Sequence, residues 1–185
     1  MSTALQSLTL EEFLTLPETL PASEFINGKI VYKPMPQGEH SRLQGKLCAV
    51  INQVTEDKKI AYAFPELRCT FGGESVVPDV SVFQWSRIPR ESSGRVSNRF
   101  FIHPDWSIEI LSPAQSQTNV LGNLLHCSQH GTELGWLLDP AEESVLVVFS
   151  DQRVQLLRGI THLPLLNGIS LQLTVEQVFG WLTLQ

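Results

Sequence analysis

Two carboxylates stand inside runs of β-forming residues in this chain of 185 residues. Asp79 lies within Val77–Phe83, and Glu109 lies within Trp106–Pro113. An acid on an otherwise apolar strand is costly to bury unless it is hydrogen-bonded, ion-paired or bound to a cation. Carboxylate oxygens are the ligands that hard divalent cations prefer. We therefore predict that the two acids share a metal site.

Each acid also has a purely structural alternative. Asp79 could cap a turn beside Gly72 and Gly73, and Glu109 could pair with Arg68 across a sheet. Either arrangement would satisfy a buried carboxylate without a metal.

Other polar residues are weaker candidates for the same site. Glu66 precedes a strand that could lie beside Asp79, and Glu24 and His40 could approach from neighbouring elements; a surface role is the alternative. His126 and His130 have the i, i+4 spacing of a metal-binding pair, but without a third ligand a solvated helix face is favoured.

The elements that must position these residues are predicted from patterns along the chain. Thr9 and Glu12 fit the capping box of a short first helix, and Asn27-Gly28 predicts a β-hairpin over Glu24–Tyr32. Pro78 is expected at a strand start or a bulge, because proline cannot donate to a central ladder. The first half then contains a helix over Glu39–Glu56 and strands over Ile60–Phe64, Leu67–Phe71 and Val76–Phe83.

The second half predicts a parallel crossover. A strand over Trp106–Leu111, a helix from Pro113 to about His130 and a strand over Leu134–Leu138 have the spacing of a βαβ unit. An antiparallel pair, Val145–Phe149 with Val154–Leu157, and a capped helix beginning near Thr174 complete the chain. The expected fold is α/β, with a mixed central sheet, flanking helices and an N-terminal hairpin, in one domain over residues 1–185.

Composition is that of a globular protein, with 42% hydrophobic and 17% charged residues. No apolar run reaches the ~20 residues that cross a bilayer, and the N-terminus lacks the basic start of a signal peptide. We expect no membrane association and a cytoplasmic location. Cys48, Cys69 and Cys127 lack CxxC spacing and are expected to be reduced.

Net charge argues against general affinity for nucleic acid. The formal charge is −6, and the half that follows Phe100 has 2 basic and 8 acidic residues. The segment Ser86–Arg99 holds four arginines against Glu91 alone, so it could touch phosphates. A solvated loop explains that segment equally well.

The order of these motifs resembles the PD-(D/E)XK nuclease superfamily, and specifically the Uma-two family of restriction-endonuclease-like proteins. The similar stretches are Phe25–Val31, His40 at the start of the first long helix, Val77–Val82, Pro104–Pro113, Gly135–Pro140 and Pro164–Leu171. The resemblance implies a restriction-endonuclease-like fold and hydrolysis of DNA phosphodiesters. It further implies that Asp79 and Glu109 bind Mg²⁺, with Mn²⁺ as a substitute, and that DNA is the partner. Cleavage of both strands would call for two sites, so a homodimer is compatible with the resemblance.

The resemblance also calls for a catalytic lysine, and the chain departs from the pattern there. The superfamily often has this lysine two residues after the second acid, where this chain has Leu111. The family resembled has it on the following helix, where the matching residue is Asn123, and no lysine follows Lys59. Asn123 is then the third site residue, able to hydrogen-bond but without charge, and a substitute cation is expected from Lys46 or an arginine. The chain is predicted to be either an endonuclease, impaired at this position, or a non-catalytic module for interaction or DNA binding.

Overall fold

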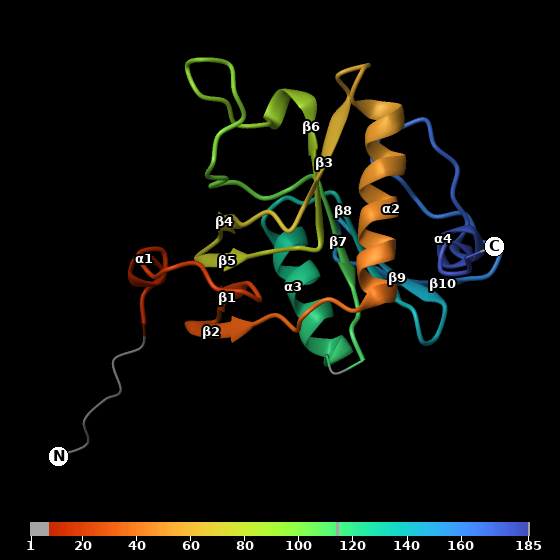
Figure 1. The fold of residues 1–185 in the computed structure, drawn as a ribbon, viewed down its shortest axis with the longest axis horizontal. Coiled ribbons are helices and arrows are strands. Elements are labelled where there is room, and N and C mark those ends of the chain that lie inside the picture. The colour runs from red at the N-terminus through yellow and green to blue at the C-terminus, as the bar shows by residue number, and fades with distance from the viewer. Residues whose placement is uncertain (1–7, 114, 185) are drawn as a thin grey trace.

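The computed structural model describes residues 8–113 and 115–184, whose strands form two sheets (Figure 1). In spatial order the smaller sheet contains β2 (Lys29–Tyr32), β1 (Ser23–Ile26), β5 (Glu74–Val76) and β4 (Cys69–Phe71). The larger sheet contains β10 (Val154–Arg158), β9 (Ser144–Phe149), β8 (Leu134–Asp139), β7 (Trp106–Ile110), β6 (Val80–Gln84) and β3 (Ala61–Pro65). The helices are α1 (Leu10–Phe13), α2 (Gly38–Thr55), α3 (Gln117–Gln129), α4 (Val175–Gly180) and the 3₁₀ turn η1 (Trp85–Arg87).

The N-terminal hairpin forms as the sequence predicts. Asn27 and Gly28 have φ angles of 51° and 73°, the left-handed values that a tight hairpin turn requires. Antiparallel pairing from Ile26 with Lys29 to Ser23 with Tyr32 then fixes the register. The Lys33 amide extends the ladder by donating to the Ala22 carbonyl at 2.9 Å, so the next side chain leaves the hairpin in a defined direction.

The larger sheet is mixed, as expected. β7 and β8 are parallel with Glu109 opposite Leu137, and α3 makes the crossover between them. The other neighbouring strands pair antiparallel. The carboxyl ends of β7 and β8 therefore meet at one edge of the sheet.

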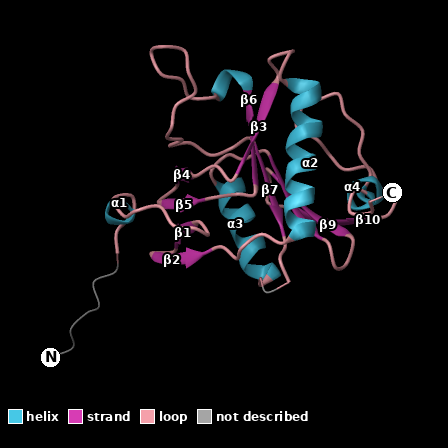
Figure 2. Ribbon diagram, viewed as in Figure 1, coloured by secondary structure: helices cyan, strands magenta, loops and turns pink. Residues whose placement is uncertain are grey.

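Helices cover both faces of the larger sheet, and Figure 2 shows its strands between α2 and α3. Leu43, Leu47 and Ile51 of α2 pack with α4 in the main core against one face. Val120 and Leu124 of α3 pack on the other face, against Leu137 and Val148. Because successive strand residues point to opposite faces, Ile108 and Ile110 belong to the α2 core while Glu109 faces the α3 side.

Two element boundaries differ from the sequence prediction. The strand expected over Val76–Phe83 is two strands, because β5 ends at Val76 and β6 begins at Val80 in a different sheet. Pro78 lies in that gap, which confirms that it interrupts the ladder. α3 begins at Gln117 rather than at Pro113. Within the described ranges, no helix has the length and apolar character needed to cross a membrane.

Candidate active site

Asp79 occupies the gap between the two sheets, and several elements bind its carboxylate. It is 1% exposed, and the Ile110 amide at the end of β7 donates to its Oδ2 at 2.7 Å. His40 in the first turn of α2 places Nε2 3.0 Å from the same oxygen. The Gln44 amide donates to the Asp79 backbone carbonyl at 2.9 Å, so both helix and sheet fix this residue.

Glu109 projects from near the carboxyl end of β7 toward the same place. The Glu109 side chain is buried, with the residue 3% exposed. Its neighbours on the strand, Ile108 and Ile110, pack on the opposite face of the sheet. The expected alternative pairing with Arg68 is wrong, since Arg68 binds Glu18 instead, with Nη2 to Oε2 at 2.7 Å. Nor does Asp79 cap the turn at Gly72 and Gly73.

Lys33 is the residue that joins the two acids. Its ammonium donates to Asp79 Oδ1 at 2.8 Å, to Glu109 Oε2 at 3.3 Å and to the Val77 carbonyl at 2.7 Å. The side chain is 11% exposed and arrives from the end of the hairpin. A lysine therefore stands between the two predicted acids, although it is 46 and 76 residues away from them in sequence.

A third acid, Glu24 of β1, stands behind this cluster. It is 4% exposed and accepts the Val77 amide at 2.7 Å, so it holds the segment whose carbonyl binds Lys33. Burial raises the pKa of Glu24, and the Lys33 charge opposes that rise. Glu24 thus links the hairpin to the gap in which Asp79 lies.

The pKa values of the two acids are shifted in opposite directions, although Lys33 lowers both. Burial raises the pKa of Asp79, but the charges and hydrogen bonds of Lys33 and His40 outweigh burial and bring it to about 2. Burial dominates at Glu109 and raises its pKa well above the ordinary value, with Lys33 opposing. Burial lowers the pKa of Lys33, but Glu109, Asp79 and Glu24 together raise it, so the ammonium stays charged.

The oxygens around Lys33 fit a hard divalent cation. Two carboxylates and one backbone carbonyl already surround a single positive charge, and Mg²⁺ commonly takes one or two carboxylates and completes its shell with water. No group of three or more His, Cys, Asp or Glu residues in the described part of the chain is arranged to hold a metal. Oxygen donors of this kind are those that hard divalent cations prefer.

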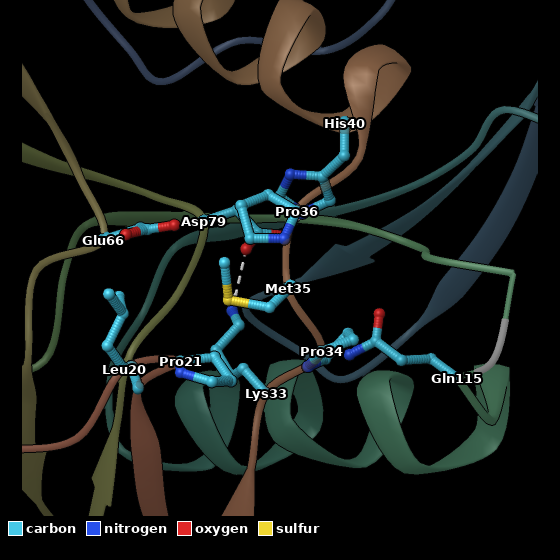
Figure 3. A pocket seen from close by; sticks show the side chains of 11 residues that line it. Leu20, Pro21, Lys33, Pro34, Met35, Pro36, His40, Glu66, Asp79 and Gln115 are labelled. Carbon is cyan, nitrogen blue, oxygen red and sulfur yellow. Dashed lines mark hydrogen bonds and ion pairs between the residues drawn. The ribbon is translucent and has the colours of Figure 1, made fainter.

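A small cavity leads to this cluster (Figure 3). Its volume is about 80 Å³, and Lys33, His40 and Asp79 contribute to its wall. Leu20 and Met35 lie around the lysine in Figure 3, and they are 88% and 57% exposed. The polar centre is thus reached through an apolar entrance.

The other predicted site residues do not all lie beside the two acids. Asn123 is half-buried on α3 and makes no hydrogen bond to either acid in the described part of the chain, so its catalytic role stays a prediction. It lies one helical turn before Cys127, whose pKa is raised first by burial and then by Glu109, so its helix face is directed toward the acids. Glu66 lines the cavity, whereas Lys46 is exposed on α2. Among the described residues the cation that contacts both acids is Lys33, whereas the sequence pointed to Lys46 or an arginine.

Of the two histidines at the end of α3, His126 is half-buried and His130, the C-cap, is exposed as a solvated face requires. His126 places Nδ1 3.4 Å from Glu74 Oε2, and both His126 and His130 pack on the ring of Phe71. They fasten the smaller sheet to α3. In the arginine segment, Arg87 binds Asp105 at 2.5 Å and Arg90 lies over the Trp85 ring, so two of its four arginines are engaged within the fold.

The chain is similar to known proteins in both sequence and fold. Residues 10–179 match the model of a family named Uma2, described as "Putative restriction endonuclease". The crystal structure of "a putative nuclease belonging to DUF820 from Anabaena variabilis" superposes with a TM-score of 0.93 at 54% identity. The match covers 95% of this chain and 99% of that chain. The comparison with curated proteins found no match.

Proposed function

The chain belongs to the Uma2 family, and on that ground we propose that it is a divalent-metal-dependent phosphodiesterase that cleaves DNA. One observation carries the proposal: Asp79, Glu109 and Lys33 meet in one buried cluster at the edge of the sheet. Two acids and a lysine are the constellation that the sequence resemblance called for. The lysine comes from the hairpin instead of from the position of Asn123.

The chain's own residues divide the work of such a reaction. Asp79 and Glu109 would hold Mg²⁺ or Mn²⁺ through carboxylate oxygens, with the Val77 carbonyl beside them. The bound cation would polarise the phosphate and lower the pKa of its water toward neutrality. His40 and the Ile110 amide fix the Asp79 carboxylate, so the ligand is oriented before substrate arrives.

Lys33 has a second task once a metal shares its oxygens. An ammonium held at this position can stabilise the negative charge that develops on the phosphate, in a water-poor site where one charge has a large effect. We assign Asn123 a weaker part, a hydrogen bond from its amide to a water or a phosphate oxygen.

A nuclease assay with an isosteric variant tests the proposal. Purified protein is given supercoiled plasmid and a single-stranded oligonucleotide with Mg²⁺ or Mn²⁺, and Asp79→Asn is compared with Lys29→Met. Lys29 is exposed on the same hairpin, so its variant should cleave like the wild type. Equal inertness of wild type and Asp79→Asn, or equal cleavage by both, would contradict the proposal.

Calorimetry distinguishes the proposed nuclease from the alternative that the sequence left open, a non-catalytic module. Titration with Mg²⁺ should give binding to the wild type that Glu109→Gln weakens, because the variant loses a charged ligand. Absence of metal binding in both would favour the module. The homodimer and the cytoplasmic location stay predictions, and gel filtration with and without DNA tests the homodimer.

A further inference from the structure

A larger cleft lies on the other side of His40 from the acids. Its volume is about 520 Å³, against about 80 Å³ for the cavity over Asp79. His40 and Gln115 line both spaces, so the cleft adjoins the proposed reaction site. It is built from the residues that follow β7 and β8 and from the first turn of α2. Ligands of open α/β sheets commonly bind beyond the carboxyl ends of parallel strands.

Two buried polar atoms in the wall of the cleft have no partner among the described residues. Ser112 is 4% exposed, and its Oγ makes no hydrogen bond. His40 binds Asp79 through Nε2, whereas its buried Nδ1 is unbonded. The α2 N-cap, Gln37, also lacks a side-chain capping bond. Leaving a buried polar group unpaired is unfavourable, so this wall is suited to a hydrogen-bonding ligand.

The charges around the cleft select the kind of ligand. Its lining includes the carboxylates of Glu39, Asp139 and Glu142, and neither lysine nor arginine is among the lining residues, although Arg158 pairs with Glu142 at 3.5 Å. Asp139 accepts the amides of Ala141 and Glu142 at Oδ1, at 3.1 and 3.2 Å, and the Gln117 side chain at Oδ2, at 3.4 Å, so the hydrogen-bonding capacity that remains at this wall is that of an acceptor. A phosphate would be repelled here, and the occupant must be uncharged and able to donate hydrogen bonds.

The wall of the cleft also has an apolar surface beside these hydrogen-bond acceptors. Leu111, Pro113 and Pro140 supply apolar contacts next to the polar groups. A flat base with an amino group, attached to a sugar hydroxyl, matches both surfaces, since carboxylates accept hydrogen bonds from exocyclic amino groups. The volume accommodates such a unit.

We propose that this cleft binds the nucleoside next to the scissile phosphate and prefers a base that carries an amino group over thymine. The inference rests on the proposed function, because the phosphate at Asp79 tethers the nucleoside to the cleft. A base inside a duplex is stacked and paired and cannot enter a pocket. The substrate class is therefore single-stranded or frayed DNA.

Uncharged nucleosides test the cleft separately from metal and phosphate chemistry. Ligand-observed NMR is recorded with deoxyadenosine, deoxycytidine and thymidine on wild type, Ala141→Trp and Ala49→Trp. Ala141 is exposed at the cleft, so tryptophan fills it, whereas Ala49 is exposed further along α2 and serves as the matched control. Binding of the two amino-bearing nucleosides should be retained in the control and lost in Ala141→Trp. Ser112→Ala, which removes only a hydroxyl, should weaken binding about tenfold if the Oγ bonds the ligand.

Cleavage of a single-stranded oligonucleotide gives the second readout. Ala141→Trp should raise KM at least about tenfold and leave Mg²⁺ binding unchanged. Nucleoside binding that is unaffected by Ala141→Trp, or equal binding of thymidine, overturns the inference. Cleavage with an unchanged KM in Ala141→Trp also overturns it while the proposed function stands. Nucleoside binding that Ala141→Trp abolishes, in a protein that never cleaves, supports the cleft and refutes the proposed function.

Discussion

Replacing Lys33 with methionine should lower the stability of the fold but raise the affinity of the site for a divalent metal. The ammonium makes two ion pairs, at 2.8 and 3.3 Å, between side chains that are at most 11% exposed. Removing one partner of a buried pair typically costs about 3–5 kcal/mol. We expect a loss near the lower end, since His40 and the Ile110 amide still bind Asp79 and the raised pKa of Glu109 lets it stay protonated.

Metal binding should change in the opposite direction. Lys33 occupies the oxygens that a divalent ion would use, so Lys33→Met removes a competing cation. A tenfold gain in Mg²⁺ affinity corresponds to 1.4 kcal/mol, and a gain of about that size is expected. Cleavage should fall by about 10²–10³, the usual effect of losing one positioned electrostatic group.

Three measurements decide this prediction. Denaturant unfolding without metal gives the stability loss, calorimetry gives the Mg²⁺ affinity, and oligonucleotide cleavage gives the rate, each beside Lys29→Met. Saturating Mg²⁺ should restore much of the stability, since a ligand at 100 times its Kd stabilises by about 2.7 kcal/mol. Unchanged metal affinity together with unchanged cleavage would refute the role given to Lys33. If the methionine variant does not fold, Lys33→Gln with added Mg²⁺ replaces it.

Four further predictions concern single residues. The pKa of Asp79 is lowered from 3.8 to about 2 on folding, so wild type should lose about 2 kcal/mol of stability relative to Asp79→Asn as pH falls from 4 to 2, measured by urea unfolding. The pKa of Glu109 is raised in the folded state, so folding retains a proton above pH 4.5; Glu109→Gln should be more stable than wild type, and only above that pH, by thermal unfolding. Asn123→Lys should change cleavage little in the wild type but partly restore it in Lys33→Met, because only the latter lacks a cation. Burial raises the pKa of the Cys69 thiol to about 12, so this thiol should react with a disulfide reagent at pH 8 only after denaturant is added.

Most of the fold could be predicted because its signals are local. The Asn27-Gly28 turn, the α2 stripe of Leu43, Leu47 and Ile51, and the capping pair Thr174 with Gln177 each act within a few residues. The break at Pro78 was also readable, since proline lacks the amide that a ladder needs. The change of sheet at that point was not, because it depends on which distant strands pair.

The two acids were predictable because each is anomalous in its own segment. Asp79 and Glu109 interrupt apolar runs, and that signal needs no partner to be seen. Lys33 carries no such anomaly, because a lysine after a hairpin looks like any surface residue. One signal could have found it: the register from Asn27-Gly28 places position 33 at the hairpin's end, beside the Ala22 backbone.

The location of Lys33 changes what the loss of lysine at position 123 means. Electrostatic stabilisation depends on where a charge lies relative to the reacting phosphate, and not on which element carries it. Two ionised acids with no nearby cation would repel each other in a buried site, so a fold that keeps both of them charged must supply one. Here the hairpin supplies it, held in register by Glu24 through the Val77 amide. Position 123 can therefore carry an uncharged asparagine while the site keeps a positive charge, and Lys33, rather than the helix, is the residue on which activity should depend.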